Sequence, residues 1–410
     1  MQADRSLLII YPWGIDSVIA KNTGAGMRVG LLAEFLRDYG FMVTVASIGR
    51  FERKIDLNGI RYRELRYPTN FFLLVLYATL VIISRLLQWQ GLHAWIYYFF
   101  YQLDGKFVRE MKGYAAEAGT IMLEYPFWSR LTEERRERTI LTDHDIIAKS
   151  WTKRGNTWLN SFLSEKLLEW ELKALQSVEQ VVFVAESDRD FFVDHGLTLE
   201  RTAVITNPMV LPPSCVDNTM SQHQLSRFRE TLFQTGALFV GSGWYPNREA
   251  AQAIVKIIAP ACPDVTFFIA GDCTRWVKRV PANVQLLGVL SAEELTILYR
   301  RITFALIPVA WGTGTSLKAV EAMAYGKVIV TTPVGVRGLT FEHGVHGIVC
   351  SDIGEFPSVI NELTTDPDHR CRLEVNALNL AKQYDYRSIY MRYLEIINGL
   401  PARYCSEPIC

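Results

Sequence analysis

Short apolar runs alternate along this chain with longer segments in which apolar residues recur every three or four positions. In the clearest example, the apolar runs 302–307 and 328–332 flank a segment that carries Leu317 and Val320 at helical spacing. Gly326 follows this segment and is placed to end a helix in the left-handed conformation. The order strand, loop, helix, strand predicts a parallel α/β unit.

The start of the chain predicts another unit of this type. Residues 7–11 and 41–47 have the pattern of buried strands, and residues 27–39 have the periodicity of a helix that Gly40 closes. The polar stretch 12–26 is then a long loop at the carboxyl end of the first strand, where open parallel sheets bind ligands. Unless these residues serve only loop flexibility, the candidates for substrate contact are Thr23, Gly24, Ala25 and Gly26.

Polar residues directly follow several other predicted strands. The strands are expected at 120–123, 139–142, 181–185 and 203–206, and the residues that follow them are Glu124, the triplet Asp143, His144 and Asp145, the pair Glu186 and Ser187, and Asn207. Carboxylates and a histidine at one sheet edge can form a polar pocket. Each residue could instead form a turn or cap a helix. We favour this for Asn207 and for Ser187, as the cap of a helix over 188–194.

His144 has the most specific chemistry among these candidates. It could contact a sugar hydroxyl or a phosphate, while Asp143 or Asp145 fixes the orientation of its ring. An Asp-x-Asp triplet after a strand can also hold a divalent metal, but the same triplet recurs at 188–190 and 366–368, so the signal is weak. A structural histidine bonded to a turn is the alternative.

The second half repeats the α/β pattern after an interruption. Residues 211–226 are polar, contain prolines and have no period, which predicts a linker between two domains. Ser291 and Glu294 form a capping box that starts a helix. The other elements expected here are strands at 237–241, 265–270 and 284–287, and helices at 248–258 and 384–398.

Gly312 and Gly314 open the loop that precedes the helix containing Leu317. Such a loop brings bare backbone N–H groups and a helix N-terminus to one point, and both attract phosphate. Lys318 and Glu321 lie on the helix behind the loop. One interpretation is a site for a nucleotide diphosphate. The other is an ordinary strand-to-helix turn with a salt-bridged helix face.

Residues 71–83 are the most apolar stretch of the chain. They fall short of the roughly 20 residues needed to span a bilayer, although the run would be longer if it extended to Trp89. Aromatic residues continue up to position 100, and three arginines precede the stretch: Arg61, Arg63 and Arg66. This combination is typical of a segment that lies in the membrane surface. A helix buried against the sheet is the alternative.

Composition narrows the class of protein. A chain of 410 residues with 49% apolar and 21% charged residues fits a globular protein of two or three domains. The formal net charge of zero argues against nucleic acid as the main partner. The seven cysteines contain no CxxC pair, so we expect reduced thiols in a cytoplasmic protein. The first apolar run is too short for a signal peptide.

The second half resembles the nucleotide-binding domain of the family 4 retaining glycosyltransferases, which have the GT-B fold. The matching blocks are ALFVGSGWYPNREA (237–250), VTFFIAGD (265–272), VQLLGVLSAEELTILYRRITFALIPV (284–309) and GTGTSLKAVEAMAYGKVIVTTPVGVRGL (312–339). The first half resembles the acceptor domain of the family through TGAGMR, LTDHD, VAESDRDFF and VITNP. The resemblance implies an α/β protein with two facing Rossmann-like domains of parallel sheets. The acceptor domain is expected over 1–212, the nucleotide-sugar domain over 226–383, and a crossover helix over 384–400.

The resemblance also implies roles for individual residues. Glu321 matches the glutamate that bonds the donor ribose hydroxyls, and His144 matches a residue near the donor sugar. Lys318 and Arg248 could neutralise the diphosphate. The other expected substrate-binding residues are Gly24 and Gly26 near the reacting phosphate and acceptor, Glu124, Gly241, Asn247, and the loop residues Gly312, Thr313, Gly314, Thr315 and Ser316.

One position departs from the pattern of the family. Many members carry a second glutamate eight positions before the one at 321, where it touches the transferred sugar, and this chain has Thr313 there. Relatives with a glycine-rich version of the loop exist. The departure leaves the donor sugar open and makes an inactive homologue more plausible.

The resemblance and the apolar segment together predict a retaining glycosyltransferase at the cytosolic membrane face, acting on a lipid-linked or surface-polysaccharide acceptor. We expect no metal or cofactor, because backbone amides, a helix N-terminus and Lys318 or Arg248 can stabilise the departing phosphate. In the family the departing phosphate takes the proton of the acceptor, which fits the lack of a convincing carboxylate pair of the glycosidase type. The rivals are a sugar-nucleotide 2-epimerase of the same architecture and a degenerate, membrane-associated binding subunit.

Overall fold

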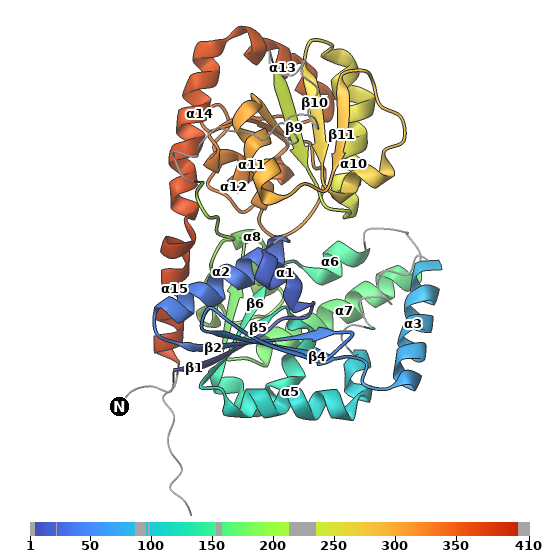
Figure 1. The fold of residues 1–410 in the computed structure, drawn as a ribbon, viewed down its shortest axis with the longest axis vertical. Coiled ribbons are helices and arrows are strands. Elements are labelled where there is room, and N and C mark those ends of the chain that lie inside the picture. Colours follow the sequence, from blue (N-terminus) through green and yellow to red (C-terminus); the bar gives the residue numbers. More distant parts are fainter. Residues whose placement is uncertain are drawn as a thin grey trace, which may run out of the picture. The chain divides into compact units, whose positions relative to one another are not determined.

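The computed structural model describes residues 5–21, 23–86, 96, 99–152, 158–212 and 235–400. The chain divides into two compact units, each with its own sheet (Figure 1). Unit 1 contains the residues up to Thr206 together with those from Ile389 onward, and unit 2 is Asn207–Ser388. Most of the expected linker 211–226 lies outside the described residues.

Unit 1 contains an eight-stranded sheet in the order β3-β4-β2-β1-β5-β6-β7-β8. Its strands are β1 (Ser6–Ile10), β2 (Met42–Gly49), β3 (Arg53–Leu57), β4 (Ile60–Arg66), β5 (Thr120–Glu124), β6 (Thr139–Asp143), β7 (Gln180–Phe183) and β8 (Thr202–Val204). All neighbouring strands are parallel except β3 and β4. The central strands are almost wholly apolar because helices such as α2 (Gly24–Asp38) and α5 (Gly105–Glu117) cover opposite faces of the sheet (Figure 1).

The other described α-helices of this unit before its C-terminal one are α1 (Ile15–Ala20), α3 (Phe71–Leu86), α6 (Ile147–Thr152), α7 (Trp158–Gln176) and α8 (Glu186–Asp194).

The first loop of unit 1 is shorter than predicted. The prediction of a continuous loop over 12–26 was wrong, since α1 lies within it and α2 already begins at Gly24. Thr23 caps α2 by accepting a 3.1 Å hydrogen bond from the Gly26 amide. A Cβ atom on Gly26 would lie 2.3 Å from the Ser17 carbonyl oxygen, so glycine lets α1 and α2 approach closely.

The predicted cap of α8 was also wrong. The helix begins at Glu186, and its N-cap residue is Ala185, which makes no side-chain capping bond. The Ser187 hydroxyl instead donates to Asp188 Oδ1 over 3.3 Å. The helix therefore starts one residue too early for Ser187 to act as its cap.

Unit 2 contains a six-stranded, fully parallel sheet in the order β11-β10-β9-β12-β13-β14. Its strands are β9 (Gly236–Val240), β10 (Thr266–Ala270), β11 (Val284–Gly288), β12 (Phe304–Ile307), β13 (Val328–Thr331) and β14 (Ile348–Val349). Its helices are α10 (Tyr245–Ala253), α11 (Ala292–Arg301), α12 (Leu317–Ala324), α13 (Phe356–Thr365) and α14 (Pro367–Ala381). Every strand predicted in this unit is present.

Local chemistry sets the helix ends in unit 2. The predicted capping box of α11 is confirmed: Ser291 Oγ accepts from the Glu294 amide, and the Glu294 carboxylate accepts from the Ser291 amide. Gly326 ends α12 with a φ of 60°, as expected. α10 begins at Tyr245, three residues before the predicted start, because Pro246 at a first-turn position favours helix initiation.

Helix α3 is apolar on both of its sides. One side packs on Tyr67 and Phe100 through Leu73. The other side is exposed, with Phe71 and Phe72 at 76% and 74% of their full exposure. The remaining exposed apolar residues of α3 are Leu74, Val75, Ile82, Ile83 and Leu86. Among the described residues, no helix is both long and apolar enough to cross a membrane.

The last helix, α15 (Tyr386–Gly399), joins unit 1 through a buried polar network. The Arg28 side chain is only 1% exposed, and its Nη2 donates a 2.6 Å hydrogen bond to the Tyr393 hydroxyl. The Tyr393 hydroxyl lies 2.9 Å from Thr142 Oγ1, and the Tyr390 hydroxyl donates to the Arg28 carbonyl oxygen. Buried arginine requires such partners, so this network fixes α15 against α2 and β6.

Replacement of Tyr393 by phenylalanine is expected to lower the free energy of unfolding by about 1–3 kcal/mol, because it removes a hydroxyl that Arg28 uses in the interior. Urea unfolding measures the effect. The control is Tyr39→Phe, which removes an exposed hydroxyl bonded only to the Met391 sulfur and should cost less than about 0.5 kcal/mol. Equal losses in the two variants would contradict a structural role for the network.

Candidate functional site

The strand order of unit 2 creates a switch point between β9 and β12. From β9 the chain runs outward through β10 and β11, and then returns to β12 on the other side of β9. Ligands of open parallel sheets bind at such switch points, outside the carboxyl ends of the strands. Lys318 Nζ donates to Asn247 Oδ1 over 2.9 Å, and Trp311 Nε1 donates to Glu249 Oε2 over 2.7 Å. Both contacts join the loop and helix after β9 to the loop and helix after β12.

The glycine loop before α12 is held by Arg337, which sequence analysis did not single out. Arg337 donates two hydrogen bonds to the Thr313 carbonyl oxygen, from Nε over 2.8 Å and from Nη2 over 2.6 Å. Gly312 has a φ of 151°, and a Cβ atom there would lie 3.0 Å from the Arg337 guanidinium. Gly314 has a φ of 70°. The glycines therefore provide both the backbone conformation and the space that Arg337 occupies.

Two ionisable side chains lie on α12 behind this loop. Burial, together with the nearby Arg337 guanidinium, lowers the pKa of Lys318 to about 8. Burial raises the pKa of Glu321 to about 7, against the opposing effects of Tyr299 and Lys318. Thr315 and Ser316, at the start of the helix, are buried. The site therefore places a cation, a carboxylate and the helix N-terminus around one loop.

A tyrosine from the neighbouring helix holds Glu321. The Tyr299 hydroxyl of α11 donates to Glu321 Oε2 over 3.1 Å. The Tyr299 ring stacks on Tyr325, with centroids 4.8 Å apart and planes 3° from parallel. Sequence analysis placed Tyr299 at the end of a helix and gave it no role.

Arg248 packs between two aromatic rings. Its Cζ lies 3.4 Å from the Trp276 ring centroid and 4.4 Å from that of Tyr245, and its Nε donates to the Gly243 carbonyl oxygen. Gly241 approaches the next loop so closely that a Cβ atom on Gly271 would lie 2.2 Å from the Gly241 carbonyl oxygen. Arg248 thus has a packing role beside the switch point, and its expected contact with a diphosphate remains a prediction.

Unit 1 has an equivalent switch point between β1 and β5. Glu124 ends β5, His144 follows β6, and His144 Nε2 lies 2.6 Å from Glu124 Oε2. The Tyr125 ring stacks on His144 with centroids 4.4 Å apart, and Trp13, from the loop after β1, packs edge-on against Tyr125. The edge therefore carries an aromatic cluster around a histidine. Burial lowers the pKa of His144, although the Glu124 carboxylate opposes this shift.

The expected role of Asp143 in orienting His144 was wrong. Asp143 is 1% exposed, neither of its carboxylate oxygens has a hydrogen-bond partner, and the ring of His144 is held by Glu124 instead. Burial, reinforced by Glu171 and Asp188, raises the pKa of Asp143 well above its usual value. Asp143 is therefore an interior carboxyl group whose surroundings favour the protonated form. Asp143 is the last residue of β6, a strand whose five residues are all buried.

Gly24 and Gly26 lie in the first turn of α2, where Thr23 caps the helix. In unit 1 the structure thus brings together Glu124 and His144, and in unit 2 Asn247, Lys318, Glu321 and the glycine loop. Among the described residues, no three His, Cys, Asp or Glu side chains are grouped as ligands for a metal ion. The metal-independent reaction stays a prediction.

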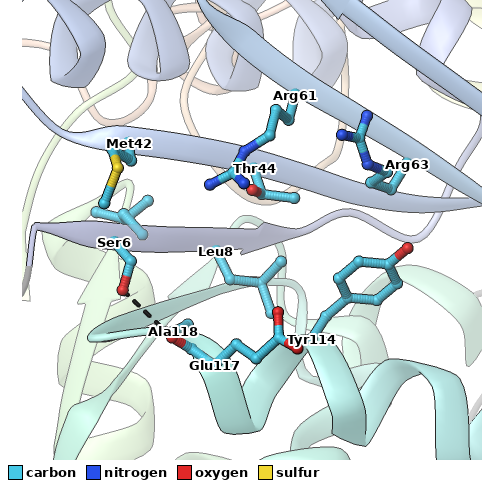
Figure 2. A pocket seen from close by; sticks show the side chains of 10 residues that line it. Ser6, Leu8, Met42, Thr44, Arg61, Arg63, Tyr114, Glu117 and Ala118 are labelled. Atoms are coloured by element: carbon cyan, nitrogen blue, oxygen red, sulfur yellow. Dashed lines mark hydrogen bonds between the residues drawn. The ribbon is translucent and has the colours of Figure 1, made fainter.

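A surface pocket of unit 1 lies away from these residues. It is bordered by the first residues of β1 and β2 and by the C-terminal end of α5, with Arg61, Arg63 and Tyr114 around it (Figure 2). Because these strands are parallel, the pocket lies at the opposite sheet edge from His144. Arg63 is engaged there by Asp56 at 2.6 Å. The pocket is therefore separate from the candidate site.

Comparison with known proteins relates part of unit 2 to a described family. Residues 234–366 match the family model described as Glycosyl transferases group 1. An uncharacterized glycosyltransferase of Methanocaldococcus jannaschii is 25% identical over 187 residues, which cover 42% of this chain and 51% of the relative. An uncharacterized 44.6 kDa protein in the cps region of Klebsiella pneumoniae is 22% identical over 174 residues, covering 39% and 45%. The chain thus spans about half the length of the curated relatives it matches.

Crystal structures extend the similarity to nearly the whole chain. Anabaena Alr3699/HepE in complex with UDP and glucose is 17% identical with a TM-score of 0.68, covering 96% of this chain and 100% of that one. Sucrose-phosphate synthase from Thermosynechococcus elongatus is 18% identical with a TM-score of 0.70, covering 96% and 98%. At these identities the likeness concerns the fold alone, and it confirms the predicted GT-B class.

Replacement of Asp143 by asparagine is expected to change the pH dependence of stability. The unfolded chain releases the Asp143 proton near its usual pKa, whereas the folded chain keeps it, so the stability of the wild type falls as pH rises through this range. Relative to the variant, the wild type should lose at most about 1.4 kcal/mol per pH unit as the pH rises above the usual pKa of an aspartate.

Urea unfolding at several pH values measures this difference. The control is Asp190→Asn, the same chemical change at an exposed residue that pairs with Arg189, and it should leave the pH dependence unaltered. Parallel stability curves for the wild type and Asp143→Asn would show that Asp143 is ionised in the folded protein.

Proposed function

This chain carries a group 1 glycosyltransferase domain, and from that premise we propose that it transfers a sugar from a nucleotide-sugar donor to a lipid-linked or polysaccharide acceptor, with retention of configuration. The observation that carries the proposal is the grouping of Lys318, Glu321 and the glycine loop at the switch point of unit 2. One structural neighbour, Anabaena Alr3699/HepE, was solved with UDP, with UDP and glucose, and with UDP-glucose.

The roles of the unit 2 residues follow from their chemistry. Burial disfavours the positively charged form of Lys318. A diphosphate is negatively charged, so its binding would stabilise that charged form. Lys318 is the second residue of α12, so the positive end of the helix dipole lies beside it and also favours an anion. Glu321 accepts hydrogen bonds from ribose hydroxyls, and this leaves Oε2 with its bond to Tyr299.

The proposed transfer needs no nucleophile from the protein. The bond between the anomeric carbon and the phosphate oxygen breaks, the acceptor oxygen bonds to the anomeric carbon on the same face, and the departing phosphate takes the acceptor proton. Lys318 and the loop amides stabilise the charge that develops on the phosphate. In unit 1, Glu124 holds His144, for which the family resemblance implies a role near the donor sugar. The proposed scheme contains no metal ion.

The exposed face of α3 supports an acceptor at a membrane. A contiguous apolar surface on a single helix is unusual for a protein surrounded only by water. A bilayer surface covers such a face by taking up its aromatic and aliphatic side chains to the depth of the headgroup boundary. The arginines of β4 precede α3 and suit anionic lipid.

A non-catalytic binding subunit is the second candidate, and Thr313 is the observation that favours it. Without a carboxylate at this position, the contact expected from the family with the transferred sugar is missing. A thermal-shift screen of nucleotide sugars, followed by product analysis with and without membrane glycolipid extracts, tests both. Stabilisation with transfer supports the enzyme, stabilisation without any transfer supports the binding subunit, and an altered sugar nucleotide without acceptor indicates an epimerase.

The affinity for a nucleoside diphosphate is expected to fall as pH rises from 7.5 to 9.5. Lys318 loses its proton in this range, and the groups that face it, Arg337, Cys273 and Glu321, do not replace its charge at the phosphate. Lys318→Met should bind about tenfold more weakly at pH 7.5 and lose this pH dependence. Titration calorimetry measures both effects. Lys256→Met, a change at an exposed lysine of the same unit, is the control, and a steep pH dependence that survives in Lys318→Met would exclude Lys318 as its source.

The double variant Phe71→Ser/Phe72→Ser is expected to lose most binding to vesicles that contain anionic phospholipid, because it removes two exposed rings without changing the packed side of α3. Flotation of the full chain with liposomes measures the bound fraction. Met42→Ser/Leu199→Ser removes two exposed apolar residues elsewhere in unit 1 and should keep wild-type binding. If the wild type does not bind vesicles, the membrane is removed from the proposal. Light scattering would then test whether α3 mediates self-association instead.

A further inference from the structure

We propose that Tyr299 is a positioning residue for the nucleotide site: its hydroxyl fixes the Glu321 carboxylate in the orientation that accepts the ribose hydroxyls. The inference rests on the proposed function, because it concerns the same donor site. It starts from a contact between two helices, in which the Tyr299 hydroxyl of α11 donates to Glu321 Oε2 of α12 over 3.1 Å.

The surroundings of Tyr299 leave its hydroxyl little freedom. The residue is 2% exposed, and its ring lies flat against Tyr325 at a centroid distance of 4.8 Å. Tyr325 is held in turn, because its hydroxyl lies 2.8 Å from Thr296 Oγ1 on α11. A hydroxyl fixed by a buried ring is a rigid donor, and rigid partners preserve the geometry of a binding carboxylate.

The hydrogen bond from Tyr299 also leaves the Glu321 carboxylate with acceptor positions that a ribose can use. An ionised carboxylate has two oxygens and about four acceptor positions, and Tyr299 uses one of them on Oε2. The opposite oxygen, Oε1, stays available for two neighbouring hydroxyls of a ribose. Tyr299 also favours the charged form of Glu321, against the burial that raises the pKa of this group to about 7.

Two roles for Tyr299 can be separated by experiment. If the residue served only to fill the space between α11 and α12, its ring would carry that role, and loss of the hydroxyl would affect all ligands alike. If it orients Glu321, loss of the hydroxyl weakens only those ligands that the carboxylate grips. The presence or absence of the ribose 2′-hydroxyl distinguishes the two cases.

The experiment compares UDP with 2′-deoxy-UDP by calorimetry on the full chain. If the wild type prefers another base among the ribonucleoside diphosphates of A, C or G, that nucleotide and its 2′-deoxy form replace the uridine pair. The wild type is expected to prefer the ribonucleotide by about tenfold or more. In Tyr299→Phe this preference should fall several-fold through weaker binding of the ribonucleotide, with little change for the deoxynucleotide.

Two further variants make the outcome decisive. Tyr325→Phe keeps the stack and loses a hydroxyl that bonds Thr296, not Glu321, so its preference should equal that of the wild type. Glu321→Gln should lower the preference by itself, and adding Tyr299→Phe to it should have no additional effect. An unchanged preference in Tyr299→Phe would overturn the inference while leaving nucleotide binding intact. A wild type that binds none of the four ribonucleoside diphosphates would instead overturn the proposed function, and with it the basis of this inference.

Discussion

Desolvation of Lys318 and Glu321 on one side of α12 is the constraint on which the candidate site depends. Burial favours the neutral form of each group. The pKa of the lysine is lowered to about 8, and the pKa of the glutamate is raised to about 7. A fold keeps such groups in the interior only if their partners are fixed, here Asn247 for the lysine and Tyr299 for the glutamate. Both side chains are thereby held in place beside the glycine loop. An anionic group on a ligand would stabilise the charged lysine, and hydroxyl groups on a ligand would stabilise the charged glutamate.

The parts of the fold that sequence analysis predicted are those set by local chemistry. The capping box of Ser291 and Glu294 and the left-handed Gly326 depend on residues within one turn of a helix, and both are confirmed. The predictions that failed also concern local signals. α1 has only six residues, too few to show a helical period. Ser187 lies in the first turn of α8, and a serine is found there as well as at the cap position.

The contacts that build the site could not be read from the sequence, because each joins residues far apart along the chain. Glu124 meets His144 only through the pairing of β5 with β6, which aligns the carboxyl ends of the two strands. Arg337 lies after β13 and bonds Thr313, which precedes α12, and no sequence motif predicts this contact. Asp143 shows the converse: it is adjacent to His144 in the chain, yet its buried carboxylate makes no hydrogen bond to the histidine.

The same long-range contacts bear on the meaning of Thr313. Arg337 grips the carbonyl oxygen of this residue, a backbone atom that any side chain at position 313 would leave in place. The shape of the glycine loop is therefore set by Gly312, Gly314 and Arg337, independently of whether a glutamate or a threonine follows Gly312. A change from glutamate to threonine removes a carboxylate from the loop, but it leaves the backbone of the loop and Lys318 in place. Under the proposed function, Thr313 would therefore affect the choice of sugar, and a loss of nucleotide binding does not follow from it.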